Sequence, residues 1–141
     1  MSKGVKEGFI RIVPCSRQTL LKKVGHEINR FLSSGMDPSQ IAVISVRGRA
    51  VKDSITHYEK LGGQRVVPAS ADEAGANIVC DTFLRFKGLE RPAIIVTDLR
   101  LVSTNYEKRM YIAVSRALNV LSVVGSKETI EQDKRLGELL A

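Results

Sequence analysis

Tryptophan is absent from this 141-residue chain, and aromatic residues make up only 5% of it. Because 43% of the residues are nevertheless hydrophobic, the core must be built mainly from aliphatic side chains. Strands rich in Val, Ile and Leu are typical of parallel sheets that are covered on both faces. The length suits one domain with one core.

Cysteine is scarce as well. Cys15 and Cys80 are the only two, and neither has a partner at the spacing of a metal site. We therefore expect no bound metal ion, and the cysteine usage fits a reduced, cytosolic setting.

No apolar run approaches the roughly 18 residues that cross a bilayer, so no membrane partner is expected. Residues 1–8 are polar and lack a signal-peptide core, so we interpret them as a linker or an end of the expressed piece, and residues 9–141 as one domain.

Negative charge is in deficit, since 22 Lys and Arg residues face 15 Asp and Glu and leave a net charge of +7. An excess of this size favours polyanionic partners, nucleic acid first. A basic surface that binds nothing is an equally good explanation of the charge alone. The charge therefore does not specify DNA.

Apolar runs alternate with helical periodicity along the chain. The pattern predicts strands at residues 9–13, 41–46, 66–67, 77–83, 93–97 and 120–124. It predicts helices at residues 17–34, 50–61, 106–117 and 127–140, and a short helical turn at 87–90. We expect Pro14 to end the first strand, Ser16 and Ser126 to cap helices, and glycines at 35 and 62–63 to end them. This alternation predicts a parallel α/β sheet.

Several cations follow the predicted strands, where ligands of open α/β sheets bind. They are Arg47, Arg49, Arg85 and Lys87. Guanidinium groups can bind phosphate through two parallel hydrogen bonds, so this rim predicts a phosphate-bearing ligand. The alternative is that these residues are solvated loop residues.

The segment from Asp81 to Glu90, followed by Pro92 and an Ile/Val strand, resembles motif V of the superfamily-1 helicases of the UvrD/Rep type. In that family the motif contacts both DNA and nucleotide. The resemblance implies DNA contacts by Thr82 and Arg85, and ATP contacts by Lys87, Gly88 and Glu90. Leu84 stands where the family often has His, which argues against a side-chain DNA contact at that position.

The segment from Tyr111 to Ala117 resembles motif VI of the same family, whose arginine reaches the γ-phosphate. Arg116 occupies that position here, and such an arginine finger is typically worth about 10³-fold or more in rate. The alternative is a helical arginine in an ion pair with Glu107 or Asp98. Residues 40–49 are similar to motif IV, which implies a γ-phosphate contact by Arg47, with Arg49 as a rival and a candidate DNA contact.

No segment matches the glycine-rich loop, ending in Gly-Lys-Ser/Thr, that cradles phosphates. Residues 94–98 superficially resemble a Walker B strand, but no acidic base follows, so we interpret Asp98 as a capping or ion-pairing residue. The resemblance covers about residues 40–125. It implies the C-terminal RecA-like domain of an ATP-dependent DNA helicase or translocase, a three-layer α/β sandwich of the P-loop NTPase type without its own phosphate loop.

The resemblance also implies what the rest of such a protein must supply. ATP and Mg²⁺ would be cofactors of the full-length protein, with the Mg²⁺ ligands on an N-terminal RecA-like domain. Single-stranded or partly duplex DNA and that N-terminal domain would be the partners, and the isolated chain should not hydrolyse ATP. One alternative is a stand-alone nucleic-acid-binding or regulatory module, and another is a small nucleotide-binding α/β domain unrelated to helicases.

Overall fold

The computed structural model describes residues 10–46, 54–82, 90–99, 106–114 and 116–133. The strands are β1 (Ile10–Cys15), β2 (Ile41–Ser45), β3 (Lys60–Leu61), β4 (Gln64–Val67), β5 (Ile78–Thr82), β6 (Arg91–Thr97) and β7 (Ala117–Ser126). The helices are α1 (Leu20–Ser33), α2 (Tyr106–Val114) and α3 (Lys127–Gln132), with short 3₁₀ turns η2 (Pro38–Gln40), η3 (Ile55–His57) and η4 (Ala74–Ala76).

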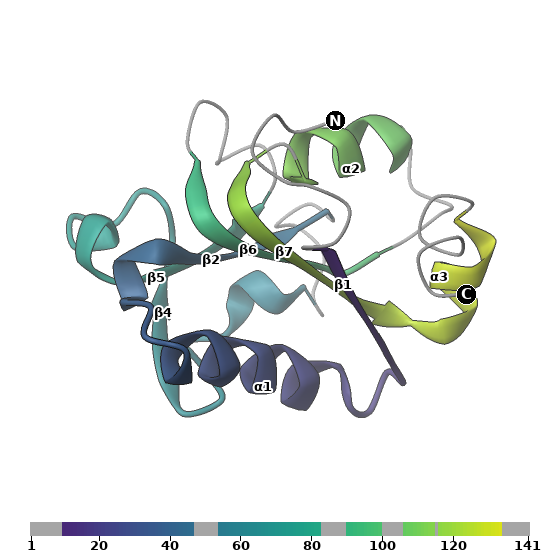
Figure 1. Cartoon of the computed structure of the whole chain (residues 1–141), viewed down its shortest axis with the longest axis horizontal. Coiled ribbons are helices and arrows are strands. Elements are labelled where there is room, and N and C mark those ends of the chain that lie inside the picture. The colour runs from purple at the N-terminus through teal and green to yellow at the C-terminus, as the bar shows by residue number, and fades with distance from the viewer. Residues whose placement is uncertain (1–9, 47–53, 83–89, 100–105, 115, 134–141) are drawn as a thin grey trace.

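The strands form one seven-stranded sheet in the order β1-β7-β6-β2-β5-β4-β3 (Figure 1). Every neighbouring pair is parallel except β3 with β4. The predicted, mainly parallel α/β sheet is therefore confirmed. The six predicted strands correspond, in chain order, to β1, β2, β4, β5, β6 and β7.

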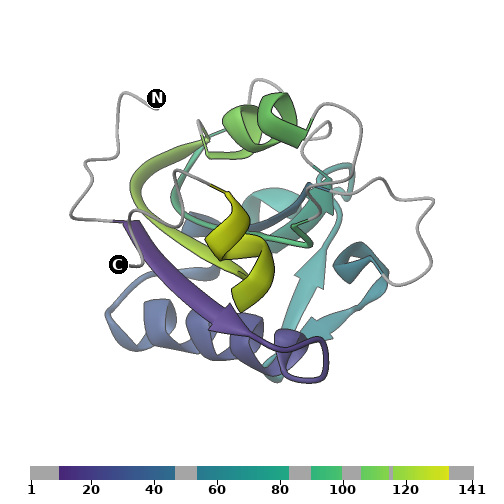
Figure 2. The same ribbon diagram turned by 90° about the vertical axis from the view of Figure 1, so that its right-hand side faces the viewer.

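The core lies on both faces of this sheet. In β2, Ala42 and Ile44 belong to one apolar cluster while Ile41 and Val43 belong to the other, because successive side chains of a strand point to opposite faces. Figure 1 shows α1 on one face and α2 with α3 on the other, and Figure 2 shows the same layers from the side of β1. The result is a three-layer α/β/α arrangement of the RecA-like kind.

The first helix starts later than predicted. Its N-cap is Thr19, and Ser16 instead forms a turn with it, in which Ser16 N donates to Thr19 Oγ1 at 2.9 Å and Thr19 N donates to Ser16 Oγ at 3.2 Å. The prediction that Ser16 caps the helix was wrong, because its hydroxyl is used within this turn. Gly35 follows the helix with a φ of +105°, as expected of a glycine stop.

The helix predicted at residues 50–61 was also wrong. Its described part, from residue 54, contains η3 and β3. Gly62 and Gly63 have φ values of +60° and +80° and form the two-residue turn between β3 and β4. Two successive positive φ values suit the tight turns of β-hairpins, so these glycines close a hairpin rather than a helix.

Prolines and strand ends account for the remaining differences. Pro14 lies inside β1 rather than ending it, because β1 pairs on one side only among the described strands. Pro92 lies inside β6, next to an irregularity in its pairing with β7. Ala117 begins β7 rather than ending α2. Ser126 caps α3 as predicted, accepting from Thr129 N at 3.2 Å, while residues 134–141 lie outside the described part.

Candidate functional site

The structure separates the candidate residues onto two opposite edges of the sheet. Thr82 ends β5, so it lies at the carboxyl edge, where its register partner in β2 is Ser45. Glu90 and Arg116 immediately precede β6 and β7, so they lie at the amino edge. Since β5, β6 and β7 all run in the same direction, the predicted DNA contact Thr82 and the predicted ATP contacts Glu90 and Arg116 lie at opposite ends of the strands.

At the amino edge, two of the residues predicted to contact ATP, Glu90 and Arg116, are close neighbours. Arg91 N donates a hydrogen bond to Arg116 O at 3.0 Å, and Arg91 pairs with Ala117 in the sheet. Glu90 is exposed beside this bond. The pairing of β6 with β7 thus brings together two residues that the sequence assigned to separate motifs.

The side chain of Arg116 is half-buried in the turn that follows α2. Its backbone N donates to Ala113 O at 3.2 Å, whereas its buried Nε has no hydrogen-bond partner among the described residues. A buried donor without a partner typically costs about 1–3 kcal/mol. The guanidinium group is therefore placed where an additional acceptor would stabilise it.

An ion pair between Arg116 and Asp98, which was the alternative, does not form. Asp98 follows the opposite end of β6, and its Oδ2 accepts from Ser45 Oγ at 2.7 Å and from Ile55 N at 2.9 Å. Asp98 is 5% exposed and has a φ of +59°. The interpretation of Asp98 as a capping residue is confirmed, whereas the side chain of Glu107 lies outside the described part of the chain.

Arg91 is a structural residue that the sequence analysis missed. Its guanidinium group donates to the carbonyl oxygens of Ala74 at 2.7 Å, Asn77 at 2.8 Å and Ile41 at 2.9 Å. Burial lowers the pKa of this guanidinium. The contacts tie together the starts of β2, β5 and β6, and so they fix the backbone on which Glu90 stands. A half-buried arginine clamp of this kind has no local sequence signal.

At the carboxyl edge, three neighbouring strands end in hydroxyl residues. Ser45 of β2 is in register with Thr82 of β5 and with Thr97 of β6. Thr82 is only 4% exposed, so a direct contact with DNA would require the residues that cover it to move. Asp98 holds both Ser45 and Ser54, which flank the segment that contains Arg47 and Arg49.

Several predicted site residues are outside the described part of the chain. They are Arg47, Arg49, Arg85, Lys87 and Gly88. Their roles stay predictions.

Within the described ranges, no group of three His, Cys, Asp or Glu side chains could hold a metal ion, and no helix is long and apolar enough to span a membrane. Cys15 and Cys80 are free thiols, and burial raises the pKa of both.

Comparison with known proteins finds similarity among solved structures. No protein-family model matches the chain, and no curated protein matches it. A solved structure that it resembles is the C-terminal domain of a possible DNA helicase from Lactobacillus plantarum WCFS1, with a TM-score of 0.64. The two are 20% identical, and the match covers 90% of this chain and 81% of that one. At this identity the similarity shows a shared fold.

Proposed function

We propose that this chain is the C-terminal RecA-like motor domain of an ATP-dependent DNA helicase or translocase of the UvrD/Rep type. The observation that carries the proposal is the hydrogen bond from Arg91 N to Arg116 O. It brings Glu90 and Arg116, from two motif-like segments, to one edge of the sheet. The fold shared with a possible helicase domain supports the same proposal.

In the proposed mechanism, ATP lies between this amino edge and an N-terminal RecA-like domain that supplies the phosphate loop and the Mg²⁺ ligands. Glu90 accepts hydrogen bonds from the ribose, while Lys87 and Gly88 lie along the nucleotide. Arg116 donates to the γ-phosphate, where its charge stabilises the charge that develops during transfer. The γ-phosphate contact predicted for Arg47 is not part of this mechanism, because the described end of β2 that precedes Arg47 lies at the carboxyl edge.

DNA lies along the opposite edge in this mechanism, near Thr82, Arg85 and Arg49. Contacts to the phosphate backbone hold the strand without reading its sequence. β6 has seven residues and connects the two edges over roughly 20 Å at the usual rise of a strand. Closure and opening of the ATP cleft would then move the DNA edge together with the ATP edge, because the sheet between them is packed on both faces.

The test is the ATPase activity of the full-length protein, stimulated by single-stranded DNA, with wild type beside Arg116→Ala. Loss of an arginine finger should lower kcat by about 10³-fold. Arg65→Ala is the matched control, because Arg65 is 59% exposed and paired with Glu73 on the hairpin side of the sheet. Circular dichroism should show the same fold for all three proteins.

The alternatives predict different results. Equal ATPase rates in wild type and Arg116→Ala, or no ATPase in either, would contradict the motor proposal and favour a stand-alone nucleic-acid-binding module. Micromolar or tighter ATP binding by the isolated chain, without any DNA binding, would favour a small nucleotide-binding domain. The motor proposal expects no ATP hydrolysis by the isolated chain.

A further inference from the structure

The outer side of α1 carries only basic charge. Lys22, His26 and Arg30 are exposed and are separated by four residues each, so they follow one side of the helix at steps of about 6 Å. The only acidic residue of α1, Glu27, is 2% exposed. Arg11 of the neighbouring strand β1 adds another exposed cation. We call Arg11, Lys22, His26 and Arg30 the basic face.

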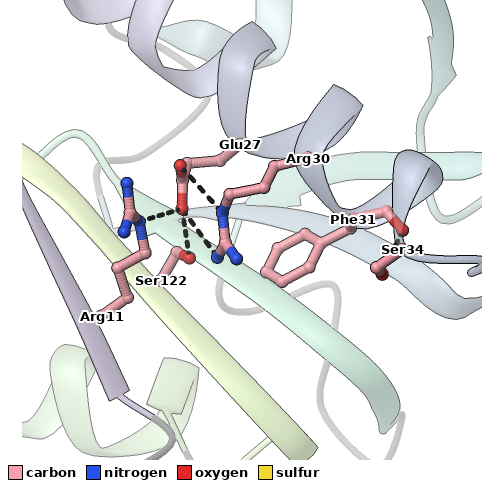
Figure 3. Close-up of polar contacts among 6 residues, drawn as sticks. All are labelled: Arg11, Glu27, Arg30, Phe31, Ser34 and Ser122. Carbon is pink, nitrogen blue, oxygen red and sulfur yellow. Dashed lines mark hydrogen bonds and ion pairs between the residues drawn. The ribbon is translucent and has the colours of Figure 1, made fainter.

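Two arginines of the basic face share the buried carboxylate of Glu27 (Figure 3). Arg11 Nε donates to Glu27 Oε1 at 3.1 Å, and Arg30 Nη2 donates to the same oxygen at 3.2 Å. Ser122 Oγ of β7 donates to this oxygen as well, at 2.8 Å. One carboxylate therefore fixes one arginine from β1 and one from α1 next to each other.

The carboxylate stays ionised in this position. Burial by itself would raise the pKa of Glu27, but the hydrogen bonds from Arg30 and Ser122 and the positive charges of Arg30 and Arg11 outweigh it and lower the pKa. Arg30 is further held by stacking over the ring of Phe31, with its Cζ 4.8 Å from the ring centre. The arginine pair is thus fixed before any ligand arrives.

Both fixed arginines still present hydrogen-bond donors to solvent. The side chains of Arg11 and Arg30 are 54% and 42% exposed. Within the described ranges, the Nη groups of Arg11 and Nη1 of Arg30 have no hydrogen-bond partner. A guanidinium whose orientation is already fixed loses less conformational entropy when it binds an anion than a free side chain does.

We propose that the basic face binds the phosphate backbone of single-stranded nucleic acid, apart from both edges of the sheet. Arg11 and Arg30 contact one phosphate group through their free N–H donors, and Lys22 contacts a neighbouring one. The cations of Lys22, Arg11 and Arg30 on one side of the domain fit a polymer with a charge on every unit, and fixed guanidinium forks match phosphate oxygens. This contact does not depend on the ATPase role of Arg116.

The test uses the isolated chain and a fluorescein-labelled oligothymidylate, with affinity measured by anisotropy over a range of salt concentrations. Lys22→Ala should weaken binding. It should also make the plot of log binding constant against log salt less steep, by about 0.7, the value for one lost phosphate contact with a single strand. Lys60→Ala is the matched control, because Lys60 is an exposed lysine on β3 at the far edge of the sheet. Its affinity and slope should equal those of wild type.

A second variant tests the arginine pair without removing its charge. Arg30→Lys keeps a cation beside Glu27 but lacks the planar fork, so it should bind the oligonucleotide several-fold more weakly with an unchanged circular dichroism spectrum. Wild-type affinity and salt slope in both Lys22→Ala and Arg30→Lys would overturn the proposal. Competition by a poly-glutamate peptide at lower concentration than by unlabelled oligothymidylate would also overturn it, and would assign the face to an acidic protein segment.

Discussion

Gly25 of α1 lies with its backbone directly against that of Gly62, in the turn between β3 and β4. A Cβ atom on Gly25 would lie 2.6 Å from both Cα and N of Gly62. Asn29 Nδ2 completes the contact by donating to Gly25 O at 3.1 Å and to Gly62 O at 2.9 Å. The β3–β4 hairpin is thus fastened to α1 by backbone proximity that only glycine allows.

Gly25→Ala should destabilise the protein by about 1–3 kcal/mol, because the added methyl group overlaps with backbone atoms that cannot move independently. The sign of this change in stability tests the contact, because glycine to alanine at an open helix position would instead stabilise the protein by up to about 1 kcal/mol. Urea denaturation of wild type and variant measures the difference. Gly75→Ala is the control, because a Cβ atom added there would have nothing within 4 Å, and its effect should be small. A stabilised Gly25→Ala protein would contradict the close approach.

Asp98→Ala should destabilise the protein by about 3 kcal/mol. The substitution removes the acceptor of Ser45 Oγ and Ile55 N, and it places alanine at a φ of +59°. Asp98→Asn should cost less, because asparagine keeps an acceptor and tolerates this backbone conformation. Thermal or urea unfolding should rank wild type first, Asn second and Ala third. Equal stability of Asp98→Ala and Asp98→Asn would show that neither the retained acceptor nor the tolerance for positive φ matters at this position.

Arg91→Ala should destabilise the protein by about 3 kcal/mol, because it leaves the carbonyl oxygens of Ala74, Asn77 and Ile41 without their charged donor. Arg91→Lys should recover only part of this loss. A single ammonium group cannot reach several carbonyls with the fixed fork of a guanidinium. Urea unfolding of both variants measures the order, and full recovery by lysine would show that charge alone matters at this position.

The ion-paired Glu27 should make stability depend on pH. Its pKa is lower in the folded state, so its stabilisation is complete above the unfolded value of about 4.3 and is lost as the pH falls through the folded value. Wild-type stability should therefore decrease below about pH 4.3, where the unfolded chain takes up the proton first. Urea midpoints over this range should fall more steeply for wild type than for Glu27→Gln. The same pH dependence of the urea midpoint in wild type and Glu27→Gln would contradict a lowered pKa of Glu27 in the folded protein.

Local patterns were sufficient for most of the elements. The continuous apolar run from Ile41 to Val46 predicted a buried central strand, and β2 lies between β5 and β6. The spacing of Val24, Ile28 and Phe31 predicted the buried side of α1. Such patterns are visible in sequence because burial repeats with the period of the strand or helix itself.

Elsewhere the same local signals had two structural meanings. Gly62 and Gly63 could end a helix or close a hairpin, since both uses need positive φ. Pro14 could end a strand or lie in one that pairs on a single side. Which meaning holds depends on whether a neighbouring strand is present, and a local window of sequence does not contain that information.

The sequence by itself determined the fold class, the basic character and the two motif-like segments that contain Thr82, Glu90 and Arg116. Only the tertiary structure decided that Glu90 and Arg116 are neighbours while Thr82 lies at the opposite edge, and that Glu27 is buried between two arginines. The physical reason is strand order. Pairing of β6 with β7 and of β7 with β1 joins residues that are distant in the chain, and these long-range contacts leave no periodic signal in the sequence.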